Sequence, residues 1–484
     1  MDKLKSYLKK IYLPKGLCLM LLLIPIVYCF CANCYLNNDS WFLFNYGSYV
    51  LENGFPTIEP FTMHENFSFV MQQWLSAIIF YLTYSNLGKI GLSLLVTLVF
   101  ALILFLIYKL CLLISKRNNY LSYILVAVSS ILLITYAIGS RPQIFSYVNF
   151  LLLFYFLESY IQKKDIRCLI PLPLISLLEI NMHAATWGLL FCFILPYIIE
   201  SFYLWLKKQE TYHLKPLIIV TMIMLLVGFI NPYGIDAMTY VFKSYGVYEI
   251  NDFITEMMVP NITTNFGKAV LLTIFAVLFI LSFAKKIKVR YIFLMLGLLY
   301  LALSAYRNYP LFVIGALLPL ADCFKDKFRD IKKSSLPKIH KALCYTALGL
   351  VIITVIVVSN PVYRLNKPYE MEGATNYLVK HADKDKAVIY TGYDDGGYLE
   401  YYGFKPYIDP RAEVFLKAVN HQKDIFKEYY KLQNGYLLPS TFLKRYNFTH
   451  FVVEKKDIVR QEISQNDNYK LVYKDKYRYI YEKK

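Results

Sequence analysis

The feature that most constrains this chain is a series of apolar runs that recurs from residue 16 to residue 360. The runs are roughly 18 residues or longer, enough for a helix to cross a hydrocarbon core of about 30 Å. Hydrophobic residues make up 57% of the chain and charged residues only 18%, against about 45–50% and about 25% in soluble proteins. The sequence therefore excludes an ordinary cytosolic enzyme and predicts a polytopic α-helical membrane protein.

The positive charges lie mostly in short loops between the apolar runs. Lys and Arg number 52 against 34 Asp and Glu, a net charge of +18. In short loops these residues set membrane orientation, so we predict no nucleic-acid partner and place the basic N-terminus and the basic loops in the cytoplasm. The segment 37–73 contains no Lys or Arg, which places it outside.

The position of the next basic loop, in the cytoplasm, determines how many times the chain crosses the membrane after residue 73. Residues 74–86 would rise only about 20 Å as a helix, so we predict that this segment lies along the outer interface and that the next crossing starts near residue 90. The odd number of crossings that results places the C-terminal region outside. The eleven predicted spans are 16–36, 90–114, 120–138, 143–161, 168–183, 184–206, 215–231, 267–284, 290–306, 309–323 and 340–360.

Composition divides the chain into two domains. Residues 1–360 form the transmembrane domain, in which 37–89 is a first external loop with juxtamembrane helices. After Asn360 and Pro361 the sequence turns polar and mixed. The pattern there predicts a helix over 371–381, a strand before the turn at Asp394 and Asp395, a helix near 421–434 and terminal strands. Residues 361–484 are therefore expected to form a small extracytoplasmic α/β domain with its own core.

Polar residues at the outer ends of the predicted spans indicate where a site lies. Arg141, His183, Asn231 and Arg307 all fall on the predicted outer face. A charge in the bilayer costs at least about 2.5–3.5 kcal/mol on insertion scales, so such residues usually line a cavity. The alternative for each arginine is a side chain that extends to lipid headgroups.

The first external loop adds groups that could act as acids or bases. We expect Asp39 to cap a helix that ends at Gly54, and a lone Asp at a helix start is more often a cap than a catalyst. Glu59 and His64 follow in a turn-rich segment. A second long loop, 232–266, carries Glu256 and is expected to close over the same site.

The order of these short motifs resembles the C-type (GT-C) membrane glycosyltransferases of bacteria that depend on polyprenyl-phosphate sugars. The resemblance covers nearly the whole chain. Its motifs are Asp39-x-Trp41, Gly47, Asn53-Gly54-Phe55-Pro56, Glu59-Pro60-Phe61, Gln73-Trp74-Leu75, Arg141-Pro142-Gln143, Asn181-x-His183, Asn231-Pro232-Tyr233-Gly234, Glu256, Arg307, Gly396-Gly397-Tyr398-Leu399 and Asp409-x-Arg411.

The resemblance implies roles for particular residues. Asp39 corresponds to the loop acid that acts as general base or metal ligand, and Glu59 to a second acid that is Asp in related members. The sequence contains neither of the nucleotide-binding motifs G-x-x-x-x-G-K-[ST] and G-x-G-x-x-G, so we expect no nucleotide cofactor. A divalent cation, Mg²⁺ or Mn²⁺, is an optional cofactor, and Asp39 is its candidate ligand. The expected binders of donor phosphate or substrate are Arg141, His183, Arg307, Tyr233, Glu256 and His64.

The function implied is an inverting transfer of a hexosyl or pentosyl group from a polyprenyl-phosphate donor to a glycan, lipid or protein of the cell envelope. The protein would be a multi-pass plasma-membrane enzyme, in contact with membrane lipids, that acts at the outer face. Three alternatives remain open. They are a transporter or flippase of lipid-linked sugars, an oligosaccharide ligase or polymerase, and a non-catalytic envelope assembly protein.

Overall fold

The computed structural model describes residues 15–134, 138–209, 212–327 and 338–484. The chain forms two compact units. The first, here called the helical unit, consists of Met1–Cys34, Ile90–Asn231 and Thr255–Leu365. The second, here called the loop unit, consists of Tyr35–Lys89, Pro232–Ile254 and Asn366–Lys484. The sequence grouped residues 37–89 with the transmembrane helices, whereas these residues pack with the C-terminal region.

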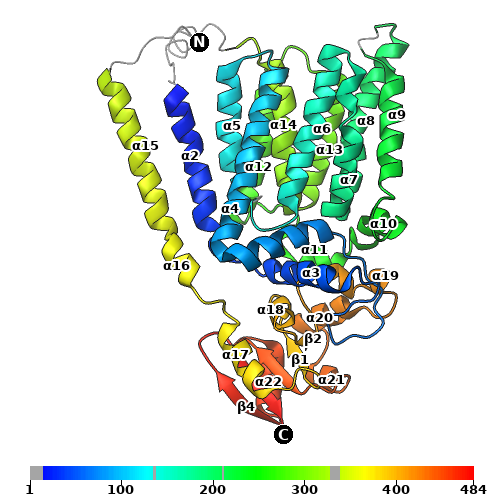
Figure 1. Cartoon of the computed structure of the whole chain (residues 1–484), viewed down its shortest axis with the longest axis vertical. Helices are drawn as coiled ribbons and strands as arrows, with labels where there is room; N and C mark the ends of the chain where they lie inside the picture. Colours follow the sequence, from blue (N-terminus) through cyan, green and yellow to red (C-terminus); the bar gives the residue numbers. More distant parts are fainter. Residues whose placement is uncertain (1–14, 135–137, 210–211, 328–337) are drawn as a thin grey trace. The chain divides into compact units, whose positions relative to one another are not determined.

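The helical unit consists of apolar helices joined by short connections (Figure 1). Helices suit these sequences because a backbone in hydrocarbon must satisfy its hydrogen bonds within its own segment. The helices are α2 (Lys15–Ala32), the later part of α4 (Trp74–Ile114), α5 (Asn119–Ile134), α6 (Gln143–Lys163), α7 (Leu172–Met182), α8 (Ala184–Leu206), α9 (Leu214–Val227), α12 (Asn265–Ser282), α13 (Val289–Ser304), α14 (Tyr309–Cys323), α15 (Lys338–Ser359) and α16 (Pro361–Asn366), with 3₁₀ turns η1 (Ile166–Leu169), η2 (Thr255–Met257) and η3 (Tyr306–Asn308).

Each of the eleven predicted spans overlaps one of these helices; residues 135–137, at the end of the third span, lie outside the described residues. Five helices are long and apolar enough to cross a membrane by themselves: Trp74–Ile114, Gln143–Lys163, Ala184–Leu206, Asn265–Ser282 and Ala342–Asn366. Shorter apolar helices cover four more of the spans. The structure is thus the helical membrane fold that the sequence predicts, and the number of crossings stays a prediction.

Hydrogen bonds between loops distinguish the two ends of the helical unit. At one end Asn118 donates to the carbonyls of Lys325 and Lys327 at 2.8 and 2.7 Å. At the other end the backbone NH of Tyr306 donates to the carbonyl of Met258 at 3.0 Å, and Arg141 pairs with Glu256. Basic loops gather at the first end and the predicted site residues of this unit at the second.

The basic end also contains a buried ion pair. Arg290, the first residue of the predicted span 290–306, lies in the first turn of α13 and is buried. Its guanidinium donates to Glu158 of α6 at 2.9 and 3.0 Å and to Glu200 of α8 at 2.5 Å. Arg290 therefore joins three helices and does not face the cytoplasm.

The loop unit is an α/β arrangement. Its five-stranded sheet has the order β2-β1-β3-β5-β4, with β1 parallel to β2 and β3 and the remaining pairs antiparallel. The predicted helices and strands of the C-terminal region are present. The elements are α3 (Asp39–Asn53), α10 (Ile235–Ser244), α11 (Tyr248–Phe253), α17 (Glu372–His381), β1 (Val388–Thr391), α18 (Gly396–Tyr401), β2 (Lys405–Pro406), η4 (Ala412–Phe415), α19 (Lys417–Asn420), α20 (Ile425–Gln433), α21 (Pro439–Leu443), β3 (His450–Val453), α22 (Ile458–Ser464), β4 (Tyr469–Lys474) and β5 (Tyr479–Lys483).

Helix α3 begins and ends close to the predicted bounds, but its cap differs. The side chain of Asn37 accepts from the backbone NH of Ser40 at 2.9 Å, while Asp39 is the first helical residue. The helix ends at Gly54, whose φ of 77° suits glycine. Helix α4 then starts at Trp74 and kinks at Gly88, where φ is 61°. The kink separates 74–86 from the next predicted span, as expected.

Candidate active site

Three charged residues meet at the loop-rich end of the helical unit. Arg141 precedes α6, Glu256 lies in η2 and Arg307 in η3. Arg141 forms an ion pair with Glu256, and the two side chains are 35% and 36% exposed, so a solute can reach the pair. Burial by itself would raise the pKa of Glu256, but the charges of Arg141 and Arg307 lower that pKa below its ordinary value.

Arg307 is the most available cation of this cluster. Its Nη1 lies 3.1 Å from the sulfur of Met257, a weak acceptor. Within the described residues Arg307 forms no ion pair. A guanidinium offers five N–H donors in a planar fork that suits phosphate oxygens. The three residues together carry two positive charges and one negative charge, so the cluster can accept an anion.

His183 lies at the same end, between α7 and α8, and is 2% exposed. Its Nδ1 lies 2.9 Å from the hydroxyls of Ser146 and Thr186. Thr186 in turn donates to Glu179 at 2.6 Å. None of these three residues was predicted from the sequence, although an acidic residue in the middle of an apolar run is itself a signal of function.

In the loop unit, Asp39 is half-buried at the start of α3. Its neighbours are fixed by the C-terminal region. The hydroxyl of Tyr369 donates to Asn38 at 2.7 Å, and the ring of Trp41 packs edge-on against Tyr398 at 4.6 Å. The start of α3, with Asp39, is therefore held by residues more than 300 positions away in the sequence.

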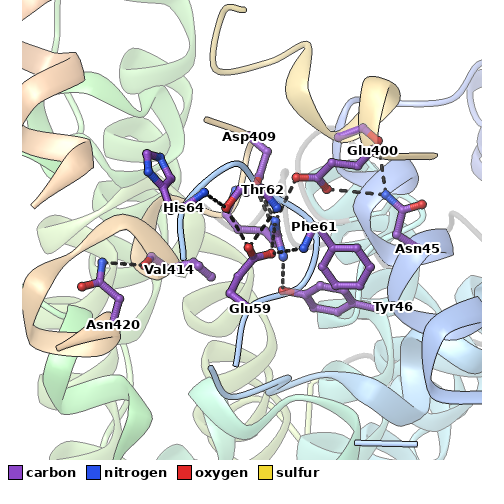
Figure 2. Close-up of polar contacts among 12 residues, drawn as sticks. Asn45, Tyr46, Glu59, Phe61, Thr62, His64, Glu400, Asp409, Val414 and Asn420 are labelled. Atoms are coloured by element: carbon purple, nitrogen blue, oxygen red, sulfur yellow. Dashed lines mark hydrogen bonds and ion pairs between the residues drawn. The ribbon is translucent and has the colours of Figure 1, made fainter. Parts of the chain in front are cut away.

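Glu59 lies in a buried cluster with Glu400 and Asp409 (Figure 2). Arg411 joins these three carboxyl groups. Arg411 donates to Glu59 at 3.0 Å, to Glu400 at 2.9 Å and to Asp409 at 2.7 Å. The other oxygen of Glu59 accepts from the backbone NH and hydroxyl of Thr62. Both oxygens of Glu59 are thus engaged in interactions that hold the loop.

Three carboxyl groups share this one guanidinium. Burial, with Asp409 and Glu59 close by, raises the pKa of Glu400 well above its ordinary value in spite of Arg411. The single guanidinium thus holds three carboxyl groups of the loop unit together.

His64 and Tyr233 also lie in the loop unit. His64 Nε2 donates to the backbone carbonyl of Tyr407 at 2.8 Å, and burial lowers the pKa of His64 to about 4. Tyr233 precedes α10 and packs edge-on against Phe55 at 6.3 Å. Of the eight predicted site residues, the structure brings Arg141, Glu256, Arg307 and His183 to one end of the helical unit, and the other four to the loop unit.

A divalent cation does not fit these side chains. Across the described part of the chain, no three His, Cys, Asp or Glu residues are grouped so that they could hold a metal ion. Glu59 is already committed to Arg411 and Thr62.

No protein-family model and no curated protein sequence matches this chain. Solved structures do match. The apo oligosaccharyltransferase of Archaeoglobus fulgidus superposes with a TM-score of 0.57 at 11% identity, over 91% of this chain and 70% of that one. ArnT from Cupriavidus metallidurans bound to undecaprenyl phosphate gives 0.51 at 11% identity, over 96% of this chain and 97% of that one.

This chain has the GT-C fold. The mycobacterial arabinofuranosyltransferase AftD agrees, with a TM-score of 0.52 at 10% identity over 98% of this chain and 42% of AftD. At these identities the likeness concerns the fold. It confirms the GT-C resemblance drawn from the short motifs and their order.

Proposed function

We propose that this GT-C protein transfers a sugar from a polyprenyl-phosphate-linked donor to a cell-envelope acceptor at the outer face of the plasma membrane. The observation that carries the proposal is the cluster of Arg141, Glu256 and Arg307 at one end of an apolar helical unit. Two arginines and one carboxylate leave an unbalanced positive charge beside hydrocarbon, where a lipid phosphate is the natural anion. ArnT was solved with undecaprenyl phosphate, and the oligosaccharyltransferase with dolichol-phosphate.

In this proposal the two arginines act on the leaving group. As the bond between the anomeric carbon and the phosphate oxygen breaks, that oxygen keeps the electron pair and gains negative charge. Arg307 donates to the phosphate oxygens, and Arg141, held by Glu256, adds a second guanidinium. Donors fixed in place before the reaction stabilise the developing charge without reorganisation.

Asp39 is the proposed general base. The acceptor hydroxyl oxygen attacks the anomeric carbon opposite the phosphate, and its proton passes to the Asp39 carboxylate, so that one displacement inverts the anomeric configuration. Asp39 is the first residue of α3 and is half-buried, so it is accessible to solvent. The helix N-terminus also favours the ionised carboxylate that a base requires.

Glu59 has a different role in this proposal. Because Arg411 and Thr62 engage both of its oxygens, we assign Glu59 to holding the first loop and not to proton transfer. His64, whose Nε2 proton is committed to the carbonyl of Tyr407, is assigned to the same task.

The decisive experiment measures sugar transfer by purified protein in nanodiscs from a panel of radiolabelled polyprenyl-phosphate sugars, with cell-envelope extract as acceptor. We expect Asp39→Asn to lower turnover about 10²–10⁴-fold and Arg307→Gln about 10²–10³-fold. The matched controls are Glu52→Gln, an exposed acid at the far end of α3, and Arg167→Gln, an exposed arginine at the basic end; both should retain wild-type turnover. Wild-type protein that binds the lipids but turns none over would contradict the proposal.

A further inference from the structure

A buried polar network surrounds His183 in the helical unit. Ser146 and Asn149 come from α6, Glu179 from α7 and Thr186 from α8. Glu179 accepts from the Asn149 amide at 2.7 Å and from the Thr186 hydroxyl at 2.6 Å. Glu179 accepts both of these short hydrogen bonds.

The position of one proton follows from this network. Thr186 has a single hydroxyl proton, and its shortest contact assigns that proton to Glu179. Thr186 can then only accept at its 2.9 Å contact with His183 Nδ1. If Nδ1 carried no proton, its lone pair would face a lone pair of the Thr186 hydroxyl oxygen at 2.9 Å, which is repulsive. Nδ1 therefore carries the proton, which the hydroxyl of Ser146, also at 2.9 Å, can share.

The other ring nitrogen is left available. Although His183 is 2% exposed, its Nε2 has no hydrogen-bond partner among the described residues. A ring nitrogen without a protein partner can accept a hydrogen bond from a ligand. Arg307 is close enough for its charge to act on His183, and Tyr147, next to Ser146, lies in the field of Arg307, Glu256 and Arg141.

We propose that His183 is a sugar-binding residue whose Nε2 accepts a hydrogen bond from a hydroxyl of the donor sugar, and that Glu179 and Thr186 are positioning residues that fix its tautomer. This assignment rests on the proposed function, because it takes the anion beside Arg307 to be the phosphate of the same donor. In this proposal His183 contacts the sugar of the donor and not its phosphate. In a neutral ring with the proton on Nδ1, Nε2 offers only a lone pair, which repels a phosphate oxygen and attracts a hydroxyl.

The test compares two ligands, bare undecaprenyl phosphate and an undecaprenyl-phosphate sugar that wild type turns over, by equilibrium binding in nanodiscs. His183→Asn keeps a polar group near the Nδ1 position and removes the Nε2 lone pair. We expect it to weaken the sugar-linked lipid about tenfold or more, as for one lost hydrogen bond in a polar site, and to leave bare undecaprenyl phosphate unchanged. Arg307→Gln should weaken both, and His213→Asn, an exposed histidine at the basic end, should weaken neither.

Conservative variants test the positioning residues. Thr186→Ser retains the hydroxyl and should bind both lipids as wild type does. Thr186→Val, which has the same shape without the hydroxyl, and Glu179→Gln should behave as His183→Asn. Equal loss of both lipids in His183→Asn, or no loss of either, would overturn the sugar contact.

The tautomer can be measured without any ligand. In protein labelled with ¹⁵N-histidine, the signals of His183 are those that disappear in His183→Asn. In wild type they should show a neutral ring protonated at Nδ1. In Thr186→Val the ring should no longer prefer this tautomer. A ring protonated at Nε2, or an imidazolium, would overturn the assignment. If wild type binds neither lipid, the proposed function and the sugar contact both fail, while the spectrum still decides the tautomer.

Discussion

Asp39 and Glu59, two carboxylates of the first loop, have opposite surroundings. Glu59 is 4% exposed and accepts from Arg411, Phe61 and Thr62. Asp39 is half-buried at a helix start whose cap is another residue. A buried carboxylate whose oxygens are both engaged holds structure, whereas a half-buried one is accessible to an acceptor. We therefore propose two roles for the same residue type, and burial distinguishes them.

A pH effect follows from Asp457, the N-cap of α22. Its side chain accepts from the backbone NH of Val459 at 2.8 Å, and burial, with Glu454 and Asp395 nearby, raises its pKa from 3.8 to about 6. A raised carboxyl pKa means that the folded state binds the proton more tightly than the unfolded state. The stabilising contribution of this group is present below about pH 4 and is lost as the pH rises through about 6.

Asp457→Asn should remove this dependence, because Asn caps a helix as well as Asp does but stays neutral. We expect slower amide hydrogen exchange in α22 than in wild type at pH 7.5 and equal exchange near pH 4, each compared at the same pH. Faster exchange in the variant at pH 7.5 would show that the ionised carboxylate stabilises the domain.

Helix α3 packs against the first part of α4 at very short range at one position. A Cβ at Gly47 of α3 would lie 2.5 Å from the carbonyl oxygen of Ala77 and 2.5 Å from the Cβ of Tyr81. Neither atom is the end of a flexible side chain, so the two helices would have to separate. The glycine is thus required by helix packing and not by a turn.

Gly47→Ala should destabilise the loop unit by about 1–3 kcal/mol, the usual range for overpacking, and should accelerate limited proteolysis in residues 55–70. Gly188→Ala is the control: it lies inside α8 with no atom within 4 Å of the added methyl group, so stability should stay unchanged or rise slightly. Equal proteolysis of both variants would contradict the close approach.

At the scale of the whole molecule, the chain alternates between the two ends of the helical unit, and the ends differ in charge and chemistry. Basic loops meet where Asn118 contacts Lys325 and Lys327, and Arg141, His183 and Arg307 lie at the other end. By the positive-inside rule, we propose that the first end faces the cytoplasm and that the arginine cluster faces outward.

Epitope tags test this orientation. A tag inserted after Ile262 and a tag after Lys484 should bind antibody on intact cells, whereas a tag after Lys164 should bind only after permeabilisation. Expression of full-length protein serves as the control for each insertion. Labelling of the Lys164 tag on intact cells would invert the topology and place the arginine cluster in the cytoplasm.

The amino-acid sequence by itself determined the membrane class, the positions of the helices and the mixed C-terminal region, because each depends on the local run of apolar or polar residues. Short motifs in order were enough to predict the GT-C fold. Only the tertiary structure decided that the first loop packs with the C-terminal region, that Arg290 is buried and that Ser146 contacts His183. These facts depend on contacts between residues far apart in the sequence, which no local pattern encodes.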